Sequence, residues 1–173
     1  MIEDLRSYVE SNPPTDLESS VSGERFPEHS RVITASCPDL APLLLDESFK
    51  NILGSLIVYT NPKAFRTLLE FMYTGRLNHR QDRGTIVCTL HLAHKFSLKK
   101  LKRECALYLI DCLEIENAIG FLYLADRCEE ELLVKRTVIF ITENYSSFSG
   151  RPDWKYLVES HPQLVSRANQ FLV

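Results

Sequence analysis

The sequence NPKAFRTLLEFMYTGRL, residues 61–77, decides the fold class of this chain. Apolar side chains recur along it at helical spacing and so form one continuous face of an α-helix. Pro62 suits the first turn, where its missing N–H has no intrahelical partner, and Gly75 suits a left-handed helix end. Burying this face supplies on the order of 10 kcal/mol of gross stabilisation, so the rest of the chain must provide a core. The face consists of Phe65, Leu68, Leu69, Met72 and Tyr73.

The composition is that of an ordinary globular protein. Of the 173 residues, 45% are hydrophobic and 25% are charged, which suits one good core, or one domain with a smaller appendage. A net charge of −3 without a long basic tract argues against nucleic acid or an anionic membrane as the main partner. The acidic start predicts no secretory signal, and no apolar run is long enough to span a bilayer. Five cysteines without paired spacing indicate a reduced, intracellular protein.

The first ten residues predict a short amphipathic helix. Its apolar stripe can either cover the chain's own core or meet a second copy of the chain, and the periodicity leaves both possibilities open. The stripe consists of Ile2, Leu5, Tyr8 and Val9.

Four short elements are predicted between this stripe and residue 61. Residues 17–26 predict a weak hairpin with a turn at Gly23. A short helix holds Val32, and Pro38 opens a leucine-rich helix that ends in acidic residues. Residues 55–59, SLIVY, are β-branched and apolar and predict the best strand of the chain.

After Gly75 and a polar loop at 78–84, the sequence is wholly helical. Residues 116–127 are apolar nearly all round, which predicts a buried helix, and residues 146–153 predict a loop. Ser97 is expected to be an N-cap. The other predicted helical segments are 86–93, 98–112, 130–144, 154–158 and 164–172.

The order of these motifs resembles the BTB/POZ domain family. The family phrase F-x-x-H is carried by Phe26 and His29, and the helix at 61–77 ends in the family's F-x-Y-T-G. The segment LAHKFSLKKLKREC, residues 92–105, resembles the family's later helix pair. The closing segment DWKYLVESHPQLVSRA, residues 153–168, looks most like the speckle-type POZ group. The remaining matching positions are Ala64, Phe65, Leu69, Phe71, Tyr73, Thr74, Gly75, Ala93, Phe96, Leu98, Leu101 and Cys105.

The resemblance implies an α+β fold and a non-catalytic function. The BTB/POZ domain, a small mixed sheet flanked by helices, would occupy residues 1–114. An all-helical 3-box and BACK-like region would follow at 115–173. Speckle-type members recruit substrates to cullin-3 ubiquitin ligases, so the expected partner is the cullin-3 N-terminal region. No cofactor, metal, nucleic acid or membrane partner is expected, and the location would be the nucleus, the cytoplasm or both.

The resemblance also implies two interaction surfaces. In this family the N-terminal helix forms a homodimer, which would make its stripe and the nearby Val32 dimer contacts. Cullin-binding members carry a hydrophobic-x-Glu motif, which Leu45-Asp46-Glu47 fits, although a shorter preceding segment allows Leu44 to replace Leu45. Burial of a small apolar knob beside a charge gives both affinity and orientation. Further cullin contacts are expected at Phe96 and Leu98 and in the 3-box at 113–141.

No MATH, Kelch or zinc-finger module is visible to hold a substrate. The chain is therefore expected to be either a fragment of a longer adaptor or a complete short protein. A short protein of this kind would heterodimerise with longer relatives or occupy cullin unproductively. The alternative function is a BTB dimerisation scaffold for transcriptional or structural complexes without cullin.

Two other clusters of polar residues have simple explanations. Cys88, His91 and His94 spread around a helix without a fourth ligand, which does not match a structural zinc site, and no local signature supports a catalytic cysteine. A basic turn lies on the polar side of the helix after residue 98. It is expected to be a solvated face or a contact for an acidic partner. The turn consists of Lys99, Lys100, Lys102 and Arg103.

Overall fold

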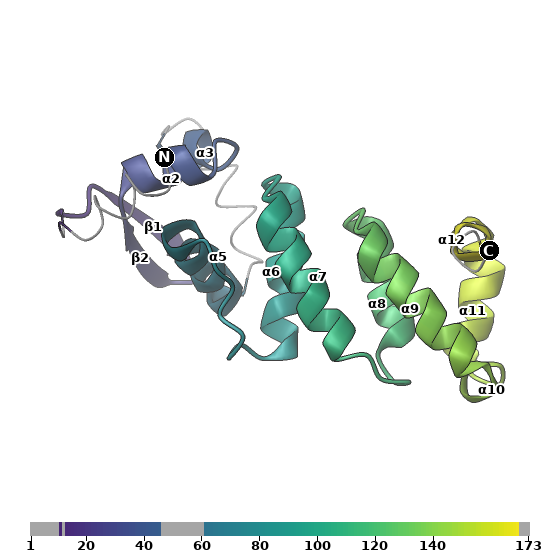
Figure 1. The fold of residues 1–173 in the computed structure, drawn as a ribbon. Coiled ribbons are helices and arrows are strands. Elements are labelled where there is room, and N and C mark those ends of the chain that lie inside the picture. Colours follow the sequence, from purple (N-terminus) through teal and green to yellow (C-terminus); the bar gives the residue numbers. More distant parts are fainter. Residues whose placement is uncertain (1–10, 12, 46–60, 170–173) are drawn as a thin grey trace. The chain divides into compact units, whose positions relative to one another are not determined.

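The computed structural model describes residues 11, 13–45 and 61–169 (Figure 1). These residues form two compact units, and the division falls between Lys102 and Arg103.

The first unit begins with a two-stranded antiparallel ribbon, which confirms the predicted hairpin. Strand β1 (Leu17–Val21) pairs with β2 (Glu24–Glu28). The turn residues Ser22 and Gly23 have φ values of 50° and 83°, and positive φ at both central positions gives the twist that a two-residue hairpin needs. Burial alternates along both strands as a one-sided ribbon requires. The buried face consists of Ser19, Val21, Phe26 and Glu28.

Two short helices follow the ribbon, as the sequence predicts. Helix α2 spans Ser30–Ser36, and α3 spans Ala41–Leu45. The carbonyl of Cys37, the C-cap of α2, accepts hydrogen bonds from the backbone N–H groups of Leu40 and Ala41, each at 3.1 Å. This corner connects the end of α2 directly to α3. The predicted strand at 55–59 lies outside the described residues.

Helix α5 (Pro62–Thr74) confirms the prediction made from residues 61–77. The Asn61 side chain accepts a hydrogen bond from the Lys63 N–H at 2.9 Å, and Gly75 ends the helix with φ 66°. Figure 1 shows α5 beside the β1–β2 ribbon, where the rings of Phe26 and Phe65 meet edge to face at 5.2 Å. The predicted face is buried except at Tyr73, which is half-exposed, and Phe71 is buried beside it.

Helix α6 (Arg83–Lys95) starts where Asp82 accepts a hydrogen bond from the Thr85 N–H at 2.9 Å. At its other end the Leu98 N–H donates to the Ala93 carbonyl and the Ser97 N–H donates to the His94 carbonyl. These two bonds define a Schellman motif with Ser97 at its left-handed position, φ 55°. Because helix α7 (Lys99–Asp111) begins two residues later, Ser97 ends α6, and its prediction as the N-cap of the next helix is wrong.

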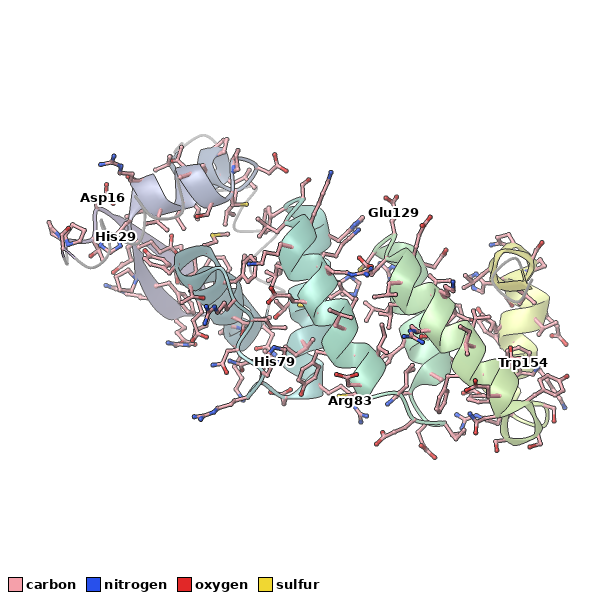
Figure 2. All side chains as sticks on the ribbon, in the orientation of Figure 1. Asp16, His29, His79, Arg83, Glu129 and Trp154 are labelled. Atoms are coloured by element: carbon pink, nitrogen blue, oxygen red, sulfur yellow. The ribbon has the colours of Figure 1, made fainter. Side chains whose placement is uncertain are left out.

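The second unit is helical. Helices α8 (Ala118–Arg127) and α9 (Glu131–Glu143) pack as an antiparallel pair (Figure 1). The same Schellman corner joins them, with Glu129 at φ 50° (Figure 2). Six of the ten residues of α8 are buried, which confirms the expected buried helix.

Three short helices complete the second unit: α10 (Tyr145–Phe148), α11 (Pro152–Ser160) and α12 (Pro162–Asn169). The loop prediction for residues 146–153 is therefore wrong at both ends. The fully buried Phe148, 6.4 Å from the Phe140 ring, holds α10. Arg151 and Asp153 form a two-point ion pair that fixes the start of α11. Among the described residues, no helix is long and apolar enough to cross a membrane.

Candidate interaction surfaces

Helix α3 directs two adjacent leucines in opposite directions. Leu44 is 4% exposed, whereas Leu45 is 49% exposed. Leu44 is therefore a core residue in this structure, and Leu45 offers an apolar side chain to solvent. Cullin contact by either leucine stays a prediction. Asp46 and Glu47, the other two residues of the predicted motif, lie outside the described residues.

Phe96 supports the corner that carries α3. Its side chain is buried, and its carbonyl oxygen lies 3.8 Å from the Cys37 thiol, which donates to it. The Phe96 side chain therefore belongs to the core, and its role as a cullin contact stays a prediction. Leu98, two residues later, is half-buried.

The predicted dimer stripe of Ile2, Leu5, Tyr8 and Val9 lies outside the described residues. Val32, which the resemblance places beside it, has no exposed surface. Its side chain belongs to the core of the first unit, and its role in a dimer interface stays a prediction.

His29 ties the arm that precedes the ribbon to helix α5. Its Nε2 lies 3.0 Å from the Pro13 carbonyl oxygen, which can only accept, so Nε2 carries the hydrogen. In the neutral ring Nδ1 then accepts from the Tyr73 hydroxyl at 2.9 Å, and the same hydroxyl oxygen accepts the His29 backbone N–H at 3.0 Å. The family positions His29 and Tyr73 are thereby joined in one hydrogen-bond network.

A second contact holds the same arm against α2. The Asp16 carboxylate accepts hydrogen bonds from the Ser30 backbone N–H at 2.8 Å and from the Ser30 hydroxyl at 2.6 Å. Figure 2 shows Asp16 and His29 together at this end of the ribbon. The bonds from Ser30 lower the pKa of Asp16. Neither Asp16 nor Ser30 was predicted from the sequence, because an aspartate just before a strand, far from its serine in sequence, gives no local signal.

Glu28 is a carboxyl group buried in the face of the ribbon. It has no exposed surface, and Oε1 accepts a hydrogen bond from the Ser19 hydroxyl at 2.6 Å. Its Oε2 is buried without a hydrogen-bond partner. Burial raises the pKa of Glu28 to about 7, against the opposing effect of the Ser19 bond. Alternation predicts the direction of this side chain, but nothing local predicts that the polar group stays buried.

A groove runs between the C-terminal ends of α2 and α5. It has a volume of about 970 Å³ and includes Leu98 and Lys100 from the start of the following helix. Its other lining residues are Ala35, Ser36, Glu70, Phe71, Met72, Tyr73, Thr74, Gly75, Arg76, Leu77 and Asn78.

The metal and nucleophile candidates gain no support from their surroundings. Within the described ranges, no group of three or more His, Cys, Asp or Glu side chains is placed to hold a metal ion. Burial raises the pKa of the Cys105 thiol to about 12, with Glu104 adding to the effect. A buried thiol of this kind is a core residue and a poor nucleophile.

Comparison with known proteins gives a consistent result. The sequence model of the BTB/POZ domain family matches residues 7–113. TD and POZ domain-containing protein 5 of Mus musculus is 30% identical over 166 residues, 95% of this chain and 49% of that protein. TD and POZ domain-containing protein 1 of Mus musculus is 30% identical over 173 residues, which cover 99% of this chain and 47% of that protein. Protein maternal effect lethal 26 of Caenorhabditis elegans is 27% identical over 169 residues, which cover 96% of this chain and 42% of that protein.

The fold of the first unit, its motif residues and the family match define a protein–protein interaction module. The chain belongs to the BTB/POZ family. It spans about half the length of the curated relatives that it matches. These relatives are TD and POZ domain proteins, so the narrower resemblance to the speckle-type group is not confirmed.

Proposed function

We propose that this chain is a homodimeric BTB adaptor that binds the N-terminal region of cullin-3 as part of a ubiquitin ligase complex and performs no catalysis itself. It acts inside the cell, in the nucleus, the cytoplasm or both. BTB/POZ domains are interaction modules, and the proposal gives this one a partner and a surface.

The observation that carries the proposal is the exposure of Leu45 at the end of α3. A leucine with 49% of its surface exposed, followed in sequence by Asp46 and Glu47, offers an apolar knob beside two carboxylates. A partner that covers this knob gains about 1.5–3 kcal/mol from burial, and a hydrogen bond to Glu47 would orient it.

The proposed organisation is a BTB/POZ domain at residues 1–114 and a helical 3-box and BACK-like region at 115–173. The family match ends at residue 113, and the helical pair α8–α9 follows. The substrate-holding part is proposed to lie outside this sequence, because the relatives are about twice as long and their names pair a TD with the POZ domain. The alternative is a short protein that heterodimerises with longer relatives.

The rival function is a dimerisation scaffold for transcriptional or structural complexes that does not bind cullin. Calorimetric titration of the purified chain with the cullin-3 N-terminal region separates the two. The adaptor requires saturable binding by the wild type that is lost when Leu45→Glu and Glu47→Lys are combined. If the wild type shows no heat of binding in the titration and the immobilised wild type retains no cullin-3 on a column, the adaptor function is refuted and the scaffold function remains.

The matched control is Leu107→Glu. Leu107 is 47% exposed on α7, almost the same as Leu45, so the two substitutions differ in place and not in exposure. The control should bind cullin-3 as the wild type does. If both leucine variants lose binding equally, a general effect of surface charge explains the loss, and the Leu45 surface is refuted.

The dimer is tested separately by light scattering coupled to size exclusion. The proposal expects twice the mass of the chain at micromolar concentration and a shift toward monomer when Leu5→Glu and Tyr8→Glu are combined. A wild-type monomer at that concentration would refute the homodimer without bearing on cullin binding.

A further inference from the structure

We propose that the groove between the ends of α2 and α5 is a second docking site, and that it takes an acidic segment of a partner protein that carries a bulky apolar side chain beside its carboxylates. The site goes beyond the proposed cullin contact at Leu45 and its acidic neighbours, because most of its lining lies on other side chains. Leu98, which also lines the groove, is the one residue that it shares with the expected cullin contacts.

The floor of the groove is apolar. Phe71, Met72 and Leu77 line it and are buried, while Tyr73 and Leu98 are half-buried at its sides. A floor of this kind excludes water from whatever covers it and favours one large apolar side chain of a ligand. The volume of about 970 Å³ is at the upper end of the range for small-molecule sites, about 300–1,000 Å³, and the groove is open to solvent. A short peptide segment fits these dimensions better than a compact metabolite.

The rim of the groove is basic. Arg76 and Lys100 both line it and are exposed, and Lys99 is the exposed residue next to Lys100 in the basic turn. Among the described residues that line the groove, Glu70 is the one carboxylate, so cationic groups outnumber anionic ones in this set. Complementary charge at a rim steers a partner and selects its sign, and here it selects an acidic segment.

The Lys100 ammonium and the backbone of Arg76 are held in position before a ligand arrives. The Lys100 ammonium donates to the Gly75 carbonyl at 2.5 Å and lies 5.7 Å from the centre of the Phe71 ring. The Thr74 hydroxyl donates to the Glu70 carbonyl at 2.7 Å and accepts from the Arg76 N–H at 3.2 Å, which fixes the backbone that carries Arg76. A rim arranged in advance lowers the conformational cost of binding.

Selection from a random-peptide phage library on the immobilised chain tests the inference. We expect the recovered peptides to be enriched in Asp and Glu around one bulky apolar residue. That enrichment should disappear when the selection is repeated on Arg76→Glu and persist on Arg80→Glu. Arg80 is also exposed but does not line the groove, so it is the matched control. Recovered peptides without acidic enrichment, or the same enrichment on all three proteins, would overturn the inference.

The most frequent recovered peptide is then labelled with fluorescein and its affinity measured by anisotropy. Arg76→Glu should weaken binding at least fivefold, and so should Ala35→Trp, which fills the groove from the exposed end of α2 without changing charge. Loss with Arg76→Glu alone would show a charge effect outside the groove and would contradict the proposal. Melting temperatures equal to that of the wild type exclude unfolding as the cause.

The cullin-3 titration is repeated with Arg76→Glu to keep this site distinct from the proposed function. Unchanged cullin binding with lost peptide binding supports two sites. If Arg76→Glu loses both peptide binding and cullin-3 binding, the groove is part of the cullin surface, and the inference of a second site is overturned. If the wild type binds the acidic peptide but not cullin-3, the adaptor fails and the groove stands.

Discussion

The Ser19 hydroxyl donates a 2.6 Å hydrogen bond to the Glu28 carboxyl on the buried face of the β1–β2 ribbon. Ser19 is paired with Phe26 and Glu28 with Leu17, so the two side chains are diagonal neighbours on one face, within reach of a glutamate. The second carboxyl oxygen of Glu28 has no partner. The ribbon therefore holds a titratable group that is more stable there without its charge.

This group makes the stability of the chain depend on pH. Its folded-state pKa is raised to about 7 from an ordinary value of 4.5, so its contribution is fully present below about pH 4.5 and is lost as the pH rises through 7. We expect Glu28→Gln to remove this loss and to stabilise the protein at pH 8 by about 2 kcal/mol relative to the wild type. Urea unfolding of the wild type and of Glu28→Gln at pH 5 and at pH 8 measures the free energy of unfolding of each protein at each pH. The control Glu18→Gln, on the exposed face of the neighbouring strand β1, should keep the loss of stability that Glu28 causes between pH 5 and pH 8.

Tyr73→Phe should destabilise the first unit by about 1–3 kcal/mol. The change removes the hydroxyl that serves both the backbone N–H and the ring of His29, so each of these part-buried groups loses a hydrogen bond. Chemical denaturation provides the measurement. Tyr145→Phe removes a hydroxyl from a tyrosine that is 55% exposed and should cost no more than about 0.5 kcal/mol. Equal effects of the two changes would refute the network.

Ser97→Gly should stabilise the protein by about 1 kcal/mol, since a left-handed residue with a Cβ costs roughly 1–2 kcal/mol and glycine loses somewhat more entropy on folding. Glu129→Gly should act in the same direction at the equivalent corner of α8 and α9. Thermal unfolding of each variant, with Ser97→Ala as the control that keeps the Cβ, tests the motif. A glycine variant less stable than the alanine variant would contradict the left-handed assignment.

Leu44→Ala and Leu45→Ala form a pair that tests the orientation of α3. Leu44→Ala should lower the free energy of unfolding by about 2–4 kcal/mol, because the loss of a buried side chain leaves a cavity. Leu45→Ala should lower it by about 0.5 kcal/mol or less, because the side chain is exposed. Denaturant midpoints with equal m-values are the required comparison. A reversal of the two values would show that α3 is rotated and that Leu44 is the exposed knob.

The local sequence pattern was sufficient to predict an element where the hydrophobic periodicity and the residues at both ends indicated the same structure. In α5 the apolar face, Asn61, Pro62 and Gly75 all indicate the same helix with the same ends, and the structure has them. The hairpin was also predictable, because Ser22-Gly23 allows positive φ at both turn positions.

Local pattern failed where distant contacts override it. The left-handed residues Ser97 and Glu129 are not glycines, so neither end signal was visible in the sequence. Residues 146–153 are rich in loop-forming types, yet the burial of Phe148 and the Arg151–Asp153 pair make much of the segment helical. The direction of Leu45 was also open, since a helix of five residues is too short to show which face it buries.

The sequence by itself determined the family, the order of the elements and the motif residues, because periodicity and turn chemistry are properties of neighbouring residues. Only the tertiary structure decided which of these side chains are exposed. Leu44, Phe96 and Val32 became core, Leu45 became surface, and the basic turn came to border an apolar groove. Burial is decided by residues far apart in the chain that pack against one another, and no local pattern contains that information.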